Sequence, residues 1–127
     1  MEVANIPINE VEDSVLADLI VDAIQDIKGE NIVKIDLRSV SDAPAQYFIV
    51  CEAESTVKIN AITNNIYKRV REELGIKPGH MEGGPSAKWN LVDYFSTIVH
   101  IFYPETRAFY DLEGLWSDGI FTTYDSI

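Results

Sequence analysis

The sequence predicts a single α/β domain in which a mixed β-sheet of about five strands has helices packed against it. Two observations support this fold class. Segments with the helical period of 3.6 residues alternate along the chain with segments that have the strand period of 2. The length of 127 residues suffices for one hydrophobic core but not for two. We therefore expect residues 1–118 to form one domain and residues 119–127 to be a frayed tail.

A first helix is expected over residues 10–28. Asn9 and Glu12 have the spacing of a capping box at its start, and Gly29 is a typical stop at its end. The apolar residues between them repeat at i, i+3, i+4 and i+7, which predicts one buried stripe. That stripe consists of Leu16, Leu19, Ile20, Ala23, Ile24 and Ile27.

Two strands and a second helix follow. Residues 31–38 alternate between apolar and polar side chains, which predicts a half-exposed strand. Residues 47–51 are continuously apolar, as is typical of a strand buried on both faces in the middle of a sheet. Ser55 is a good N-cap for the next helix, and Gly75 ends it. The predicted buried stripe of this helix consists of Ile59, Ile62, Ile66, Val70 and Leu74. The succession of strand, helix and strand indicates a βαβ crossover.

The last third of the chain predicts a β-hairpin and a short helix. Residues 89–94 and 97–103 alternate strongly and lie two residues apart. Tight hairpin turns need a positive φ, where Gly or Asn is usual, so Phe95 at this place predicts a longer or bulged turn. Pro104 opens a helix that we expect to end at about residue 112.

The composition argues against several classes of function. Ten Lys and Arg against 21 Asp and Glu give a net charge of −11, which disfavours binding to nucleic-acid phosphate or to an anionic membrane. We find no secretory signal and no run of about 18 apolar residues, so we expect no membrane attachment and a cytoplasmic location. Residues 1–30 and 91–127 hold most of the acidic excess, which favours a basic partner surface. A general solubility charge would give the same distribution.

Residues with catalytic or metal-binding chemistry are few. The sequence contains no nucleophile elbow, phosphate loop or dinucleotide fingerprint, and Cys51 lies in the most buried predicted strand. Metal-ligating side chains occur at His80, Glu82, Asp93 and His100, but on three different strands and without helical spacing. We therefore expect no enzyme, no metal and no cofactor, and a structural hydrogen bond for His100.

Aromatic side chains are concentrated in the last third. Aromatic residues beside a few charges are typical anchors of protein interfaces, although core packing is the alternative for each of them. The cluster consists of Trp89, Tyr94, Tyr103, Phe109, Tyr110 and Trp116.

Several blocks of sequence have an order and spacing that resemble a known signature. They are residues 89–94 (Trp-Asn-Leu-Val-Asp-Tyr), 98–102 (Ile-Val-His-Ile-Phe) and 107–116 (Arg-Ala-Phe-Tyr-Asp-Leu-Glu-Gly-Leu-Trp), preceded by Glu82-Gly83 and residues 47–50. Together they resemble the ribosomal silencing factor family, also called Iojap-like, over about residues 12–118. The chain departs from the family's usual pattern at Gln46, Glu54 and Phe95, where Asp, Gly and Gly are usual.

The resemblance implies a function in translation rather than catalysis. It implies a small α/β protein with nucleotidyltransferase-like topology but without the catalytic motif of those enzymes. It further implies binding to the large ribosomal subunit through its interface protein L-fourteen. Such binding would block joining of the small subunit and repress translation when nutrients are limiting.

Six residues are predicted to contact the receptor. Trp89 and Tyr94 are predicted to be aromatic anchors. Asp93 and Glu113 are predicted charge partners for Lys or Arg of the receptor. Tyr110 and Trp116 are predicted flanking contacts. Support of the fold is the alternative for each. Arg107 is expected to order Asp111 or Glu113 rather than to touch the partner.

Two other functions remain open from the sequence. One is a degenerate nucleotidyltransferase-like protein that binds a nucleotide, in which case nucleotide or magnesium should raise the melting temperature. The other is a generic adaptor that forms a homodimer, in which case the dimer interface should cover the aromatic cluster.

Overall fold

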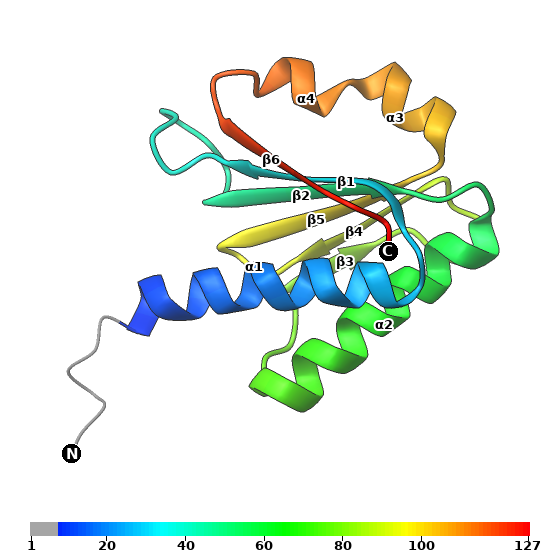
Figure 1. Ribbon diagram of the computed structural model, residues 1–127, viewed down its shortest axis with the longest axis horizontal. Helices are drawn as coiled ribbons and strands as arrows, with labels where there is room; N and C mark the ends of the chain where they lie inside the picture. The colour runs from blue at the N-terminus through cyan, green and yellow to red at the C-terminus, as the bar shows by residue number, and fades with distance from the viewer. Residues whose placement is uncertain (1–7) are drawn as a thin grey trace.

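A six-stranded mixed sheet lies between two layers of helices in this computed structural model (Figure 1). The structure describes residues 8–127, with side chains from residue 13 onward, so the predicted capping box of Asn9 and Glu12 lies outside the described side chains. In chain order the elements are α1 Ile8–Asp26, β1 Glu30–Asp36, β2 Tyr47–Glu52, α2 Thr56–Leu74, β3 His80–Glu82, β4 Trp89–Asp93, β5 Thr97–Phe102, α3 Pro104–Tyr110, α4 Leu112–Leu115 and β6 Ile120–Tyr124.

The strand order across the sheet is β3-β4-β5-β2-β1-β6. Strands β2 and β5 are parallel, and every other neighbouring pair is antiparallel. Helix α2 carries the chain from β2 in the middle of the sheet to β3 at its edge. The predicted fold class, a mixed sheet with helices against it, is confirmed, with six strands in place of about five.

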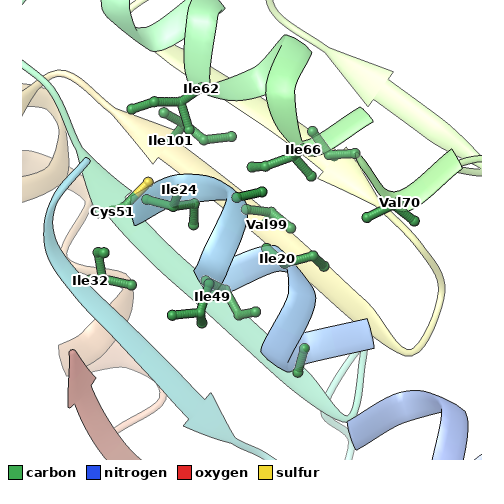
Figure 2. Packing of buried hydrophobic residues seen from close by; sticks show 14 of the residues in the cluster. Ile20, Ile24, Ile32, Ile49, Cys51, Ile62, Ile66, Val70, Val99 and Ile101 are labelled. Atoms are coloured by element: carbon green, nitrogen blue, oxygen red, sulfur yellow. The ribbon is translucent and has the colours of Figure 1, made fainter. Parts of the chain in front are cut away.

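The main core lies between the sheet and helices α1 and α2. Figure 2 shows Ile20 and Ile24 of α1 and Ile62 of α2 pointing toward Ile49 of β2 and Ile101 of β5, and all five are fully buried. Both predicted helical stripes and the predicted central strand are therefore confirmed.

Helix α2 begins and ends at the predicted residues. The Ser55 hydroxyl accepts a hydrogen bond of 3.1 Å from the backbone N–H of Lys58. Gly75 adopts a φ of 69° and donates its N–H to the carbonyl of Arg71, which closes the last turn.

The turn of the β4–β5 hairpin is tighter than predicted. It has only two residues between Tyr94 and Thr97, which are joined by a backbone hydrogen bond of 2.9 Å, and Phe95 adopts a φ of 70°. The side chain of Asp93 stabilises this conformation by accepting the N–H of Phe95 at 2.7 Å. The Phe95 ring lies against Gly79, where an added Cβ would come within 2.4 Å of it. The expectation of a longer or bulged turn was wrong because the hydrogen bond to Asp93 and the packing of the ring against Gly79 stabilise the positive φ.

The expectation of a frayed tail was also wrong. Residues 120–124 form β6, which pairs antiparallel with β1, and Tyr124 packs against the main core. Beyond the strand, the side chains of Gln25 and Lys28 donate hydrogen bonds of 2.9 and 2.6 Å to the carbonyls of Asp125 and Ile127. The sequence Ile-Phe-Thr-Thr-Tyr has the β-branched and aromatic composition of a strand. By pairing with β1, this strand forms hydrogen bonds with backbone N–H and C=O groups that β1 would otherwise expose at the edge of the sheet.

Gly119 provides a direct test of this docking. An added Cβ would lie 2.5 Å from Cγ2 of Ile35 and 3.0 Å from Cδ2 of Leu37, whereas at Gly84 it would meet nothing within 4 Å. We expect Gly119→Ala to lower the free energy of unfolding by about 1–3 kcal/mol, because overpacking against a strand forces a shift. Gly84→Ala is the matched control and should change little. Equal urea midpoints for the two variants would mean that residues 119–127 are not docked.

Candidate protein-docking surface

The face of the sheet opposite α1 and α2 is covered over only part of its width. On this face a second, smaller core joins Ile35, Phe48 and Val50 of β1 and β2 to Leu112 of α4 and to Trp116. Helices α3 and α4 therefore lie over β1 and β2 (Figure 1). Strands β3 and β4 lie toward the opposite edge of the sheet.

The strand register determines which side chains share this uncovered part. Antiparallel partners point to the same side of a sheet, so the pairing groups Trp89, Leu91 and Asp93 of β4 with His80 and Glu82 of β3. The three β4 residues are half-buried and the two β3 residues are exposed. We call this region, together with the outer surface of α3 and α4, the open face.

Trp89 is held in one orientation at the centre of the open face. Its indole Nε1–H donates a hydrogen bond of 3.1 Å to Nδ1 of His100. Its ring centroid lies 4.8 Å from that of Phe102 and 4.8 Å from that of Tyr110. The hydrogen bond confirms the structural role predicted for His100. Trp89 thus contacts both a buried ring, that of Phe102, and an exposed ring, that of Tyr110.

Helices α3 and α4 add exposed apolar side chains beside Trp89. Tyr110 is 51% exposed, and its ring lies at 5.0 Å from the ring of Phe109, which is 80% exposed. Leu115 is 70% exposed, while Trp116 is partly buried against Phe48. Phe109 belongs to the aromatic cluster found in the sequence, but neither Phe109 nor Leu115 was among the six predicted contacts. The signal was present, because residues 109–116 hold more apolar side chains than such short helices can bury on one face.

A buried guanidinium holds α3 and α4 to the sheet. Arg107 donates from Nη1 to Glu52 at 3.1 Å and to the carbonyl of Asn31 at 2.7 Å. It also donates from Nε and Nη2 to Oε2 of Glu113, at 3.0 and 2.7 Å. Of the two predicted partners of Arg107, Glu113 is confirmed, while Asp111 accepts the N–H of Gly114 instead. Glu113 therefore already has a cationic partner within the chain.

Tyr94 lies on the opposite face from the other predicted contacts. It is 4% exposed and packs into the main core between the sheet and the helices. Burial, together with the nearby Tyr67, raises the pKa of Tyr94 to about 12. The structure thus brings together five of the six predicted residues and excludes Tyr94 from the open face.

The charge around the open face is acidic. Residues 91–127, which include α3, α4 and most of β4, contain six acidic residues and one basic residue, Arg107, whose guanidinium is buried in ion pairs. The strands and helices that form the open face carry the carboxylates of Glu82, Asp93, Asp111 and Glu113. Such a surface repels phosphate and attracts basic protein groups.

The described residues offer little for catalysis. Burial raises the pKa of the Cys51 thiol to about 12, so the reactive thiolate is strongly disfavoured at neutral pH. Among residues 13–127, no three His, Cys, Asp or Glu side chains come together in a group that could hold a metal ion. No helix in the described part of the chain is long and apolar enough to span a membrane.

Comparisons with known proteins agree with one another. A family model described as ribosomal silencing factor during starvation matches residues 9–126. The ribosomal silencing factor RsfS of Halalkalibacterium halodurans is 36% identical to this chain, and the match covers 81% of this chain and 86% of that protein. RsfS of Bacillus subtilis is 38% identical, and the match covers 76% of this chain and 80% of that protein. A crystal structure of a protein from Chromobacterium violaceum has a TM-score of 0.77 and 31% identity, and the match covers 82% of this chain and 85% of that one.

His100 makes the stability depend on pH. Burial lowers its pKa from 6.5 to about 4, so the unfolded chain takes up a proton that the folded chain excludes. Stability should therefore fall as the pH drops from about 6.5 toward 4, by roughly 2–3 kcal/mol in total.

Two measurements check this expectation. Urea unfolding between pH 7 and pH 4.5 should show a smaller loss for His100→Gln than for the wild type. In NMR titration of the wild type, the His100 ring should titrate near pH 4. An ordinary value near 6.5 would show that the ring is not buried.

Proposed function

The chain belongs to the ribosomal silencing factor family, and from that premise we propose that it binds the large ribosomal subunit and prevents the small subunit from joining it. The receptor in this proposal is the interface protein L-fourteen, as the sequence resemblance implies. Binding would repress translation in the cytoplasm when nutrients are limiting. The protein would act by occupying a surface, with no chemical step.

The observation that supports this proposal is the open face itself. Exposed apolar surface that is bordered by polar residues marks protein interaction sites. Here Phe109, Tyr110 and Leu115 expose half or more of their surface on two adjacent helices. Because the surrounding charge is acidic, a basic ribosomal protein is a better receptor than ribosomal RNA.

Trp89, at the centre of the open face, is ordered before binding. Trp89 is fixed by His100 on one side and by Phe102 and Tyr110 on the others. A side chain that is already ordered loses little conformational entropy when a partner covers it, which favours affinity. The docking residues that we propose are Trp89, Asp93, Tyr110, Glu113 and Trp116, with Phe109 and Leu115 added and Tyr94 left out.

Cosedimentation tests the proposal directly. The protein should sediment with purified free large subunits in a sucrose gradient. Added before the small subunit, it should lower the yield of joined ribosomes. Unchanged yield at saturating protein would contradict the proposal. A rise in melting temperature with nucleotide or magnesium, without subunit binding, would instead favour the nucleotide-binding alternative.

Tyr110→Ala separates docking from folding. The ring is half exposed, so its loss should weaken binding to large subunits about tenfold while the melting temperature falls only slightly. Val57→Ala is the matched control, because Val57 is 78% exposed on α2, on the opposite side of the sheet. Equal affinity of the two variants would place the docking surface elsewhere.

A further inference from the structure

A small hollow lies beside Trp89 on the open face. It has a volume of about 170 Å³ and is lined by Glu82, Gly83, Trp89 and Leu91. Pockets for cofactors and drug-sized ligands usually measure about 300–1,000 Å³. The hollow is therefore too small for such a ligand and is of a size for one amino-acid side chain.

The backbone around the hollow is held in place by a polar network beneath it. Oδ1 of Asn90 accepts the N–H of Gly84 at 3.1 Å, and Nδ2 of Asn60 donates to the carbonyls of Gly84 and Pro85 at 3.0 Å each. Asn90 is 2% exposed and donates in turn to Asn60 and Thr63. The loop after β3 is thus fixed to helix α2 in the free protein, which keeps the hollow open.

Gly83 is required for this arrangement. Its φ is 112°, in a region that side-chain-bearing residues rarely adopt, and an added Cβ would lie 1.9 Å from Oδ1 of Asn90. The shape of the hollow therefore depends on a backbone conformation that only glycine adopts easily.

The lining combines an apolar wall with one carboxylate. Trp89 and Leu91 are half-buried, whereas the side chain of Glu82 is 66% exposed. Within the described chain, the hydrogen bond of Glu82 joins its Oε2 to Nε2 of His80 at 2.7 Å. An aliphatic stem that ends in a cation fits such a lining, because its methylene groups can pack against the apolar wall while the carboxylate attracts the cation.

We propose that the hollow receives one Lys or Arg side chain of the docking partner, with its stem against Trp89 and Leu91 and its cation at Glu82. This inference rests on the proposed function, because it identifies which chemical group of the receptor the open face recognises. An acidic side chain or a phosphate would be repelled by Glu82 and by the net charge of −11. A neutral apolar side chain would gain no charge-assisted contact with Glu82.

Two variants with equal net charge test the inference on ribosomes. Glu82→Gln should weaken cosedimentation with large subunits about tenfold, because the neutral amide cannot form a charge-assisted pair. Glu72→Gln removes the same charge from an exposed position on α2, across the sheet from the open face, and should change the affinity less than twofold. Equal effects of the two substitutions would overturn the inference.

A small probe tests the hollow without ribosomes. Propylguanidinium should shift the indole N–H resonance of Trp89 saturably in NMR spectra, while Trp116, the other tryptophan of the chain, serves as an internal reference. Propylurea, which has a similar shape but no charge, should cause no shift, and Glu82→Gln should abolish the response. An equal shift with propylurea, or none with propylguanidinium up to about 100 mM, would contradict the inference.

The two experiments also separate this inference from the proposed function. If wild-type protein does not cosediment with large subunits but propylguanidinium still binds beside Trp89, the proposed function fails and the cation site remains. If the protein cosediments but neither Glu82→Gln nor the probe has the expected effect, the function remains and the cation site is wrong.

Discussion

The position of the open face depends on the buried ion pairs of Arg107. One guanidinium joins Glu113, at the start of α4, to Glu52 of β2 and to the backbone of β1. Removing one member of a buried ion pair typically costs about 3–5 kcal/mol, because the other charge is left without a partner. These contacts hold α3 and α4 over β1 and β2. On the same face of the sheet, the apolar residues of β4 lie toward the opposite edge, where the proposed partner could reach them.

This arrangement explains how a small acidic domain would recognise the proposed partner through an open surface. Trp89 belongs to the sheet, yet Tyr110 of α3 lies directly against its ring, so the exposed helix and the uncovered strands form one continuous surface. The carboxylates that surround this surface disfavour RNA phosphate, while the apolar centre supplies area to bury. In the proposed complex, affinity and selectivity would thus come from different residues of the same face.

The helical stripes and the central strand could be predicted from the sequence, whereas the pairing of β6, the turn at Phe95 and the face that Tyr94 occupies were missed. Both helical stripes and the continuous run of residues 47–51 follow from periodicity alone. The strand after Gly119 was missed because its pairing partner β1 is far away in the sequence, and strand propensity depends on such context. The turn at Phe95 was mispredicted because the backbone N–H of Phe95 donates a hydrogen bond to the side chain of Asp93, which stabilises the turn. Tyr94 was assigned to the wrong face, although strand alternation from Trp89 places it opposite.

Photo-cross-linking from two exposed positions tests most directly whether the open face is the docking surface. The photoreactive residue p-benzoylphenylalanine would replace Phe109, which is 80% exposed on α3, or Val57, which is 78% exposed on α2. With purified large subunits, the account predicts a cross-link to a basic ribosomal protein from position 109 and none from position 57. A cross-link from position 57 alone, or from position 109 only to ribosomal RNA, would contradict it.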